Sequence, residues 1–264
     1  STAMGYDTRA SGFISTAMGS YTTASTDYST AMGNVTIAEG YASTAMGDGT
    51  TAYGDYSTAM GYGTTAEGQW STAMGVSTTA YGDYSTAMGY YTIASGENST
   101  AMGSITEASG ENSTAMGYEA GAYGDYSTAM GYGTTASDYG SLVIGQFNSS
   151  GSTVTNSETI YDTANTAFVI GNGENAGSPS DAFKVMFNGD ATLSNDLTVK
   201  GDVVISSDAR LKANIVSLGS TLARLLLIDG KSYTMKKDGK QKIGVLAQDI
   251  QKVFPELVST DDRD

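Results

Sequence analysis

One five-residue sequence, STAMG, recurs ten times along this chain, and successive copies always begin fourteen residues apart. The copies begin at Ser1, Ser15, Ser29, Ser43, Ser57, Ser71, Ser85, Ser99, Ser113 and Ser127, and residues 141–145 read SLVIG in the same register. A fixed, short period is typical of a solenoid, in which each repeat forms one coil that stacks on its neighbours. Fourteen residues are too few for a helical hairpin. We therefore expect two strands of about five residues in each coil, joined by two tight turns.

The interior of these coils must be narrow, because the repeats contain few large aliphatic residues. Residues 1–140 have no leucine and only seven valine, isoleucine and phenylalanine residues, too few for a conventional hydrophobic core. Side chains alternate between the faces of a strand, so Ser, Ala and Gly of STAMG share one face, and Thr and Met share the other. The second half of each repeat has an alanine at ten successive equivalent positions. We expect these small residues to fill the space between the two strands of a coil.

The face that carries Thr and Met then lies outside the coil, where its methionines form a long apolar stripe. The stripe consists of Met4, Met18, Met32, Met46, Met60, Met74, Met88, Met102, Met116 and Met130, followed by Ile144. Soluble proteins rarely leave such a stripe uncovered, and parallel copies of the same chain around one axis would cover it. We predict an all-β fold, a parallel β-roll assembled as a homotrimer, with these residues as the trimer core. The alternative is that the methionines fill gaps inside a single, wider coil.

Composition excludes several classes of protein. The chain has no cysteine and no histidine, which excludes disulfide scaffolds, Cys/His metal sites and a Ser-His-Asp hydrolase. It has no run of about 18 apolar residues that could span a membrane as a helix. Residues 1–150 carry 13 acidic side chains and one basic side chain, Arg9, which argues against binding of nucleic acid or anionic lipid. No pattern of residues indicates a cofactor.

The fourteen-residue units, with their SxAxG-type strand, resemble the head domain of trimeric autotransporter adhesins of the YadA type. The resemblance covers residues 1–145 and implies eleven coils of a left-handed parallel β-roll, assembled as a homotrimer. In that family the Val and Ile positions of the motif face the trimer axis, and Thr and Met occupy those positions in this sequence.

Residues 146–206 break the period, and we expect them to form a β-rich connector or shaft. Segments rich in Ser, Thr and Asn separate short apolar runs in this part of the chain. These runs predict strands over 166–171, 182–187, 191–194, 197–199 and 202–205.

The remaining residues, 207–264, contain three motifs: SDARLK at 207–212, GVLAQ at 244–248 and FPE at 254–256. The pattern around them predicts a strand over 230–236 and a helix that ends at Val253. The motifs resemble the C-terminal intramolecular chaperone domain of phage tailspikes and endosialidases, a self-cleaving peptidase family. The resemblance implies a small α+β chaperone segment that directs trimer assembly.

The same resemblance implies an autocleavage site. In a chain without histidine, a desolvated lysine can activate a serine hydroxyl. Carried over from the family, Ser207 is the nucleophile and Lys212 its base, and the scissile bond follows Ser206. The chaperone would hold three chains in register and then leave, so that unfolding could not easily reverse assembly. From the residues alone, the alternative is that Ser207 lies in a loop and Lys212 pairs with Asp208.

Three further columns of the repeat have weaker implications. One column, a set of equivalent positions in successive repeats, holds four acidic residues: Asp83, Glu97, Glu111 and Asp125. Their oxygen atoms could hold a cation. The simpler interpretation is that they are solvated turn residues, and we predict no metal site. Five aromatic residues at a turn could contact a receptor by stacking on sugars, or could pack only within the turn: Tyr28, Tyr56, Trp70, Tyr84 and Tyr126. Threonines on the outer strand suggest ice binding, but other residue types interrupt their row.

Taken together, these patterns favour a homotrimeric extracellular fibre, either a tail fibre of a phage or contractile injection particle or a cell-surface adhesin. Its partners would be further copies of itself and a glycan or protein receptor on a host or cell surface. Autoproteolysis by the chaperone segment would be its only enzymatic activity. The alternative is a tailspike enzyme that degrades host polysaccharide, which would need a pair of carboxylates in a cleft.

Overall fold

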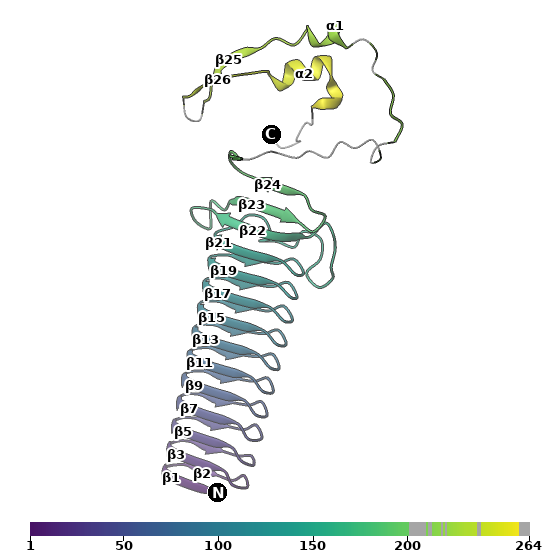
Figure 1. The fold of residues 1–264 in the computed structure, drawn as a ribbon. Coiled ribbons are helices and arrows are strands. Elements are labelled where there is room, and N and C mark those ends of the chain that lie inside the picture. The colour runs from purple at the N-terminus through teal and green to yellow at the C-terminus, as the bar shows by residue number, and fades with distance from the viewer. Residues whose placement is uncertain (201–209, 211–212, 218, 220, 237–238, 259–264) are drawn as a thin grey trace. The chain divides into compact units, whose positions relative to one another are not determined.

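The chain forms two compact units, Ser1–Thr198 and Val199–Asp264. The computed structural model describes residues 1–200, 210, 213–217, 219, 221–236 and 239–258. The first unit is a parallel β-solenoid with a short antiparallel extension, and the second is a small α+β unit (Figure 1). Among the described residues, no helix is both long enough and apolar enough to cross a membrane.

The STAMG segments form the first strand of each coil, and together these strands make one parallel sheet, sheet A. Equivalent residues of successive coils pair directly, so that Met4 lies beside Met18 and Gly5 beside Gly19. The strands are β1 (Thr2–Tyr6), β3 (Thr16–Ser20), β5 (Thr30–Asn34), β7 (Thr44–Asp48), β9 (Thr58–Tyr62), β11 (Thr72–Val76), β13 (Thr86–Tyr90), β15 (Thr100–Ser104), β17 (Thr114–Tyr118), β19 (Thr128–Tyr132) and β21 (Leu142–Gln146).

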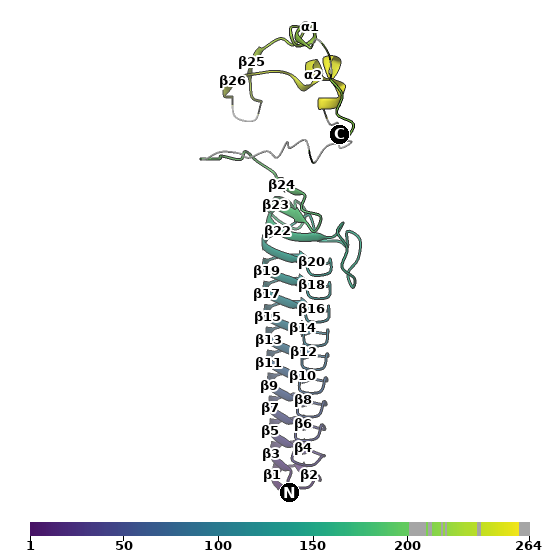
Figure 2. The same ribbon diagram turned by 45° about the vertical axis from the view of Figure 1, so that its right-hand side comes forward.

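The second strand of each coil has two residues rather than the expected five. These strands form the parallel sheet B, which stacks alongside sheet A (Figure 2). They are β2 (Arg9–Ala10), β4 (Thr23–Ala24), β6 (Ile37–Ala38), β8 (Thr51–Ala52), β10 (Thr65–Ala66), β12 (Thr79–Ala80), β14 (Ile93–Ala94), β16 (Glu107–Ala108), β18 (Gly121–Ala122) and β20 (Thr135–Ala136). They end early because the amides of Glu39 and Gly40 both donate to the carbonyl oxygen of Ala52, at 2.9 and 3.2 Å. Two successive amides that share one acceptor cannot continue a ladder.

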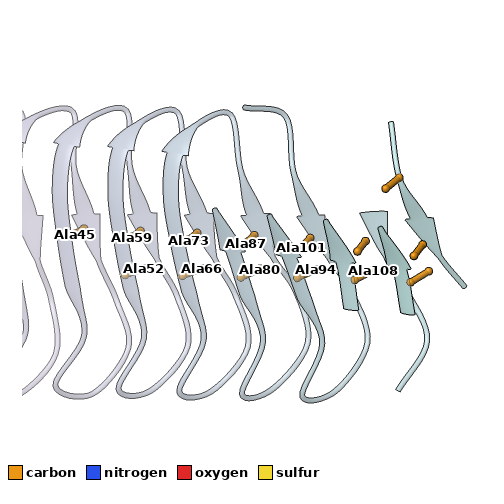
Figure 3. Close-up of a cluster of buried hydrophobic side chains, with 14 of the residues drawn as sticks. Ala45, Ala52, Ala59, Ala66, Ala73, Ala80, Ala87, Ala94, Ala101 and Ala108 are labelled. Atoms are coloured by element: carbon orange, nitrogen blue, oxygen red, sulfur yellow. The ribbon is translucent and has the colours of Figure 1, made fainter. Parts of the chain in front are cut away.

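Small side chains fill the interior of the solenoid. From the second coil onward, the alanines of both sheets are fully buried and face one another across the coil (Figure 3). From the second coil to the tenth, the first serine of the repeat and the residue seven positions later are also buried; that residue is threonine, as in Thr64, except for Ala120. The predicted all-β fold of fourteen-residue parallel coils is therefore confirmed.

Two columns of glycine let successive coils approach closely. A Cβ atom on Gly61 would lie 2.0 Å from the carbonyl oxygen of Gly75, and one on Gly68 would lie 2.0 Å from that of Gly82. Real Cβ atoms essentially never approach other atoms this closely. Gly61 also has a φ of +125°, which L-residues rarely adopt. Contact between coils thus requires glycine in the column of Gly61 and favours it in the column of Gly68, which Thr26 interrupts in the second coil.

The solenoid ends after ten complete coils, because the eleventh repeat contributes only β21 to the sheets. Asn148 replaces the missing strand of sheet B. Its Oδ1 accepts a hydrogen bond from the Thr135 amide at 2.8 Å, and its Nδ2 donates to the Thr135 carbonyl at 2.9 Å. The side chain thus pairs with the last strand as a backbone would. The expectation of eleven coils is wrong by this one incomplete coil.

Sheet A continues beyond the repeats through β22 (Thr166–Asn172), β23 (Asp181–Met186) and β24 (Ala191–Leu193). Strand β22 pairs in parallel with β21, whereas β23 and β24 add in antiparallel orientation. The strand predicted over 197–199 is absent, because these residues follow the edge strand and have no partner strand among the described residues. The strand predicted over 202–205 lies outside the described residues.

A buried carboxylate fastens the connecting loop to the end of the solenoid. Asp138 is fully buried, and its Oδ1 accepts a hydrogen bond from the Thr155 amide at 2.6 Å. Its Oδ2 accepts one from the Thr166 amide at 2.7 Å, at the start of β22. One side chain therefore holds both the loop and the strand that follows it.

The second unit contains the predicted strand and helix. Its elements are α1 (Leu222–Leu225), the antiparallel pair β25 (Lys231–Thr234) and β26 (Gln241–Gly244), α2 (Ala247–Val253) and the 3-10 helix η2 (Pro255–Leu257). The guanidinium of Arg224 lies 4.3 Å from the ring centroid of Phe254 and donates to the carbonyl of Val253. This contact joins α1 to the end of α2.

Candidate functional site

The methionines of sheet A lie on its outer face. In β3, Ala17 is fully buried whereas its neighbours Thr16 and Met18 are half-buried, and the same alternation recurs in the following coils. In the first coil Met4 is 62 % exposed. The methionines therefore lie outside the coil and leave its interior to alanine, serine and threonine.

Larger apolar residues extend this stripe past the repeats. Strand pairing places Ile144 beside Ile170, Ile170 beside Phe183, and Phe183 beside Leu193. Sequence analysis missed this extension because the fourteen-residue period stops. The signal was present in the sequence, since FVIG at 168–171 repeats the LVIG of residues 142–145 after a longer spacing.

Aromatic residues from the first six coils form a continuous row along the edge where sheet B turns into sheet A. We call this row the aromatic ladder: Phe13, Tyr28, Tyr41, Tyr56, Trp70 and Tyr84. Successive ring centroids are between 5.0 and 6.0 Å apart. The ring plane of Trp70 is inclined by only 3° to that of Tyr56 and by 4° to that of Tyr84. Four of the five predicted aromatic residues are thus brought together.

The fifth aromatic residue, Tyr126, lies outside the ladder and instead packs on Tyr139 at 5.3 Å. Conversely, sequence analysis missed Phe13 and Tyr41, which occupy the column before the other members. At this turn, side chains from two adjacent columns of successive coils contact each other. Comparing the repeats one column at a time does not reveal such a contact. Within the ladder, burial and the neighbouring Tyr28, Tyr56 and Asp27 raise the pKa of Tyr41.

The acidic residues beside the ladder have structural partners. The Oδ1 atoms of Asp27, Asp55, Asp83 and Asp125 each accept the backbone N–H of the residue fourteen positions earlier, at 2.8 Å. Glu111, in the same column, instead accepts a hydrogen bond from Asn112 at 3.0 Å. No group of three or more acidic side chains in the described parts of the chain could hold a metal ion. The aspartates of this column therefore fasten one turn to the next.

A cavity of about 340 Å³ lies where the connecting loop covers the last coils. Glu119, Phe147, Ser152 and Pro179 contribute to its lining, together with Asn148. The amide group of Asn148 is already engaged by the backbone, as described above. The carboxylate of Glu119 raises the pKa of the adjacent Tyr118.

The predicted autocleavage residues Ser206, Ser207 and Lys212 lie outside the described residues. Elsewhere in the chain, Lys231 and Asp229 form an exposed ion pair, and this hydrogen bond raises the pKa of Lys231. The assignment of Ser207 as nucleophile and Lys212 as its base therefore stays a prediction from the sequence.

Two family models match the chain. The YadA head domain repeat, a model of two copies, matches residues 15–35, 38–64, 66–92, 94–120 and 122–148. The chaperone of endosialidase, a peptidase family, matches residues 207–259. A search of curated proteins found no match.

The solenoid and these two matches define a protein of the adhesin or tail-fibre type, with a chaperone of the kind that directs trimer assembly. The chain carries YadA head repeats followed by an endosialidase chaperone, in the order that its sequence motifs predict.

Proposed function

We propose that this chain assembles as a homotrimeric extracellular fibre that attaches its carrier to a host or cell surface. The observation that carries the proposal is the stripe of outward-facing methionines on sheet A. Full burial of an exposed methionine contributes about 1.5–3 kcal/mol, and covering one that is already half-buried contributes a fraction of that. In a parallel trimer, each methionine would meet its equivalents from the other two chains, because all three chains have the same register. Beyond the repeats, Ile170 and Phe183 would add further apolar contacts of the same kind between the three chains.

Both family matches support this proposal. Head repeats of the matched type belong to adhesins, and the chaperone supplies a means of aligning identical chains before the long stripe closes. Parallel in-register assembly matters here because every coil has nearly the same surface. A slip of one coil would bury almost as many methionines as the correct register, so an alignment device is needed.

The oligomeric state of the full chain tests the trimer. We expect size-exclusion chromatography with light scattering to give three chains per particle at micromolar concentration. Met74→Asp, which places a charge in the middle of the stripe, should reduce the trimer to smaller species. Tyr81→Asp introduces the same charge on an exposed residue just after β12 and should leave the trimer intact. A folded wild-type monomer, or a Met74→Asp trimer as stable as the control, would refute the proposal.

We also propose that the chaperone segment releases itself. The Ser207 hydroxyl attacks the carbonyl carbon of Ser206, Lys212 accepts the hydroxyl proton, and the Ser207 amine leaves with a proton. Water then hydrolyses the resulting ester and frees a fibre that ends at Ser206. The intact mass of assembled material tests this. Wild type and Ser206→Ala should be cleaved, whereas Ser207→Ala should remain whole; cleavage of Ser207→Ala would exclude the mechanism.

A further inference from the structure

The turn that carries the aromatic ladder holds four of the six ladder residues in the left-handed backbone region. The φ angles of Tyr28, Tyr56, Trp70 and Tyr84 lie between 53° and 59°. This region is unfavourable for L-residues, and asparagine and glycine tolerate it best. Large aromatic side chains are therefore a poor choice for the backbone at this position.

Other coils show that the fold itself does not require aromatic residues here. Ala42, Asn98 and Asn112 occupy the same turn position with φ angles of 52–54°. The flanking strands of those coils are the same as in the coils that carry tyrosine or tryptophan. The other turn of the coils has the same left-handed φ at residues as different as Tyr21, Val35 and Ile105, so the strain belongs to the backbone of the solenoid and not to the rings. The backbone therefore does not dictate a row of aromatic side chains at this turn.

The centre of the ladder leaves ring surface accessible. Tyr56, Trp70 and Tyr84 are 48, 46 and 51 % exposed. Their parallel planes have centroids 5.4 and 5.0 Å apart, more than the about 3.5–4.0 Å of van der Waals contact between carbon atoms. The rings therefore overlap only in part, as in offset stacking. Each ring can offer part of its electron-rich face to the slightly positive C–H groups of a ligand.

Fixed carboxylates flank these rings. The Oδ1 atoms of Asp55 and Asp83 accept backbone N–H groups at 2.8 Å, which holds the side chains in place and leaves Oδ2 to accept hydrogen bonds from a ligand. The one basic side chain of residues 1–150, Arg9, lies in the first coil. An anionic ligand would meet uncompensated repulsion here, whereas hydroxyl groups would find acceptors.

We propose that the central part of the aromatic ladder, Tyr56, Trp70 and Tyr84 with Asp55 and Asp83, binds an uncharged glycan laid along the axis of the solenoid. Sugar C–H faces would stack on the rings and sugar hydroxyls would donate to the carboxylates. A repeating polymer suits the site because the site itself repeats from coil to coil. This inference rests on the proposed attachment function and names the class of receptor.

Trp70 provides a direct test, because it is the only tryptophan of the chain. We expect its fluorescence to change in a saturable way when the full chain is titrated with neutral hexasaccharides of glucose, N-acetylglucosamine, galactose or mannose. Polysialic acid, as an anionic probe, should give no change. Unchanged Trp70 emission with every neutral probe at millimolar concentration, or a response to polysialic acid alone, would overturn the proposal.

Substitutions then separate binding from folding. Tyr84→Asn gives this turn the residue that the protein itself uses at Asn98, so the backbone should fold normally. We expect it to weaken binding of the responsive hexasaccharide about fivefold to tenfold. Tyr62→Ser, on the opposite edge of the solenoid, is the matched control, because Ser20 and Ser104 occupy the equivalent position. Equal affinity for Tyr84→Asn and Tyr62→Ser would assign the ladder a purely structural role.

Light scattering on the same samples keeps the two proposals apart. A wild-type monomer that still binds the hexasaccharide would refute the trimer and leave the glycan site standing. A trimer whose Trp70 emission does not respond would do the opposite.

Discussion

Replacing Gly61 by alanine would test whether direct contact between backbones sets the spacing of the coils. The added Cβ would lie 2.0 Å from the carbonyl oxygen of Gly75 and 2.9 Å from its carbon. Neither atom can move without breaking hydrogen bonds of sheet A. Backbone strain of about 1–3 kcal/mol, together with one lost hydrogen bond of about 0.5–1.5 kcal/mol, gives a loss of about 2–4 kcal/mol. At about 2–4 °C per kcal/mol, the melting temperature should fall by about 5–15 °C.

Gly63→Ala is the matched control in the same coil. Gly63 has a φ of +60°, and the nearest atom to its Cβ would be Ser77 Oγ at 3.7 Å. Tyr21 and Val35 occupy the equivalent position in other coils, so a side chain fits there. The cost should be about 1–2 kcal/mol from φ alone. Thermal unfolding followed by circular dichroism compares the two variants, and equal melting temperatures would refute the argument from close contact.

Three further changes have defined outcomes. Asp138→Ala should leave the buried amides of Thr155 and Thr166 unpaired, cost about 3–5 kcal/mol and speed hydrogen exchange at both amides. Slow exchange in the variant would contradict this role. Thr64→Val removes a buried hydroxyl that has no hydrogen-bond partner, so the melting temperature should hold or rise; a fall of several degrees would indicate an overlooked partner. Because the raised pKa of Tyr41 favours its neutral form in the folded state, stability should decline as the pH rises above 10, and Tyr41→Phe should lessen that decline between pH 9 and 11. An equal decline in both proteins would mean that Tyr41 does not contribute.

The sequence alone predicts which face of sheet A is buried, because small and large residues alternate along each STAMG strand. Ala17 and Met18 differ in burial as the pattern of STAMG requires. Small residues fill the interior, and each of the ten STAMG repeats has an alanine in the same place. A strict period and strict alternation leave a single choice of inner face.

Other features depend on contacts that a column-by-column comparison of repeats does not contain. The short strands of sheet B end because Glu39 and Gly40 share the carbonyl of Ala52, a matter of turn geometry rather than of residue type. The aromatic ladder draws its residues from two columns, so a comparison within one column does not predict that Tyr41 packs against Tyr56. The amide group of the Asn148 side chain pairs with Thr135 in place of a strand's backbone, and no pattern typical of a strand predicts such a contact.

The interchangeable coils have a consequence for how such a protein can vary over time. Each coil hydrogen-bonds to the coil before it and the coil after it in the same way, so loss or duplication of fourteen residues leaves every remaining group with an equivalent partner. The length of the solenoid would then change in steps of about 4.7–4.9 Å, the distance between neighbouring strands. Recombination between near-identical repeats could thus lengthen or shorten the stack without redesigning any of its faces.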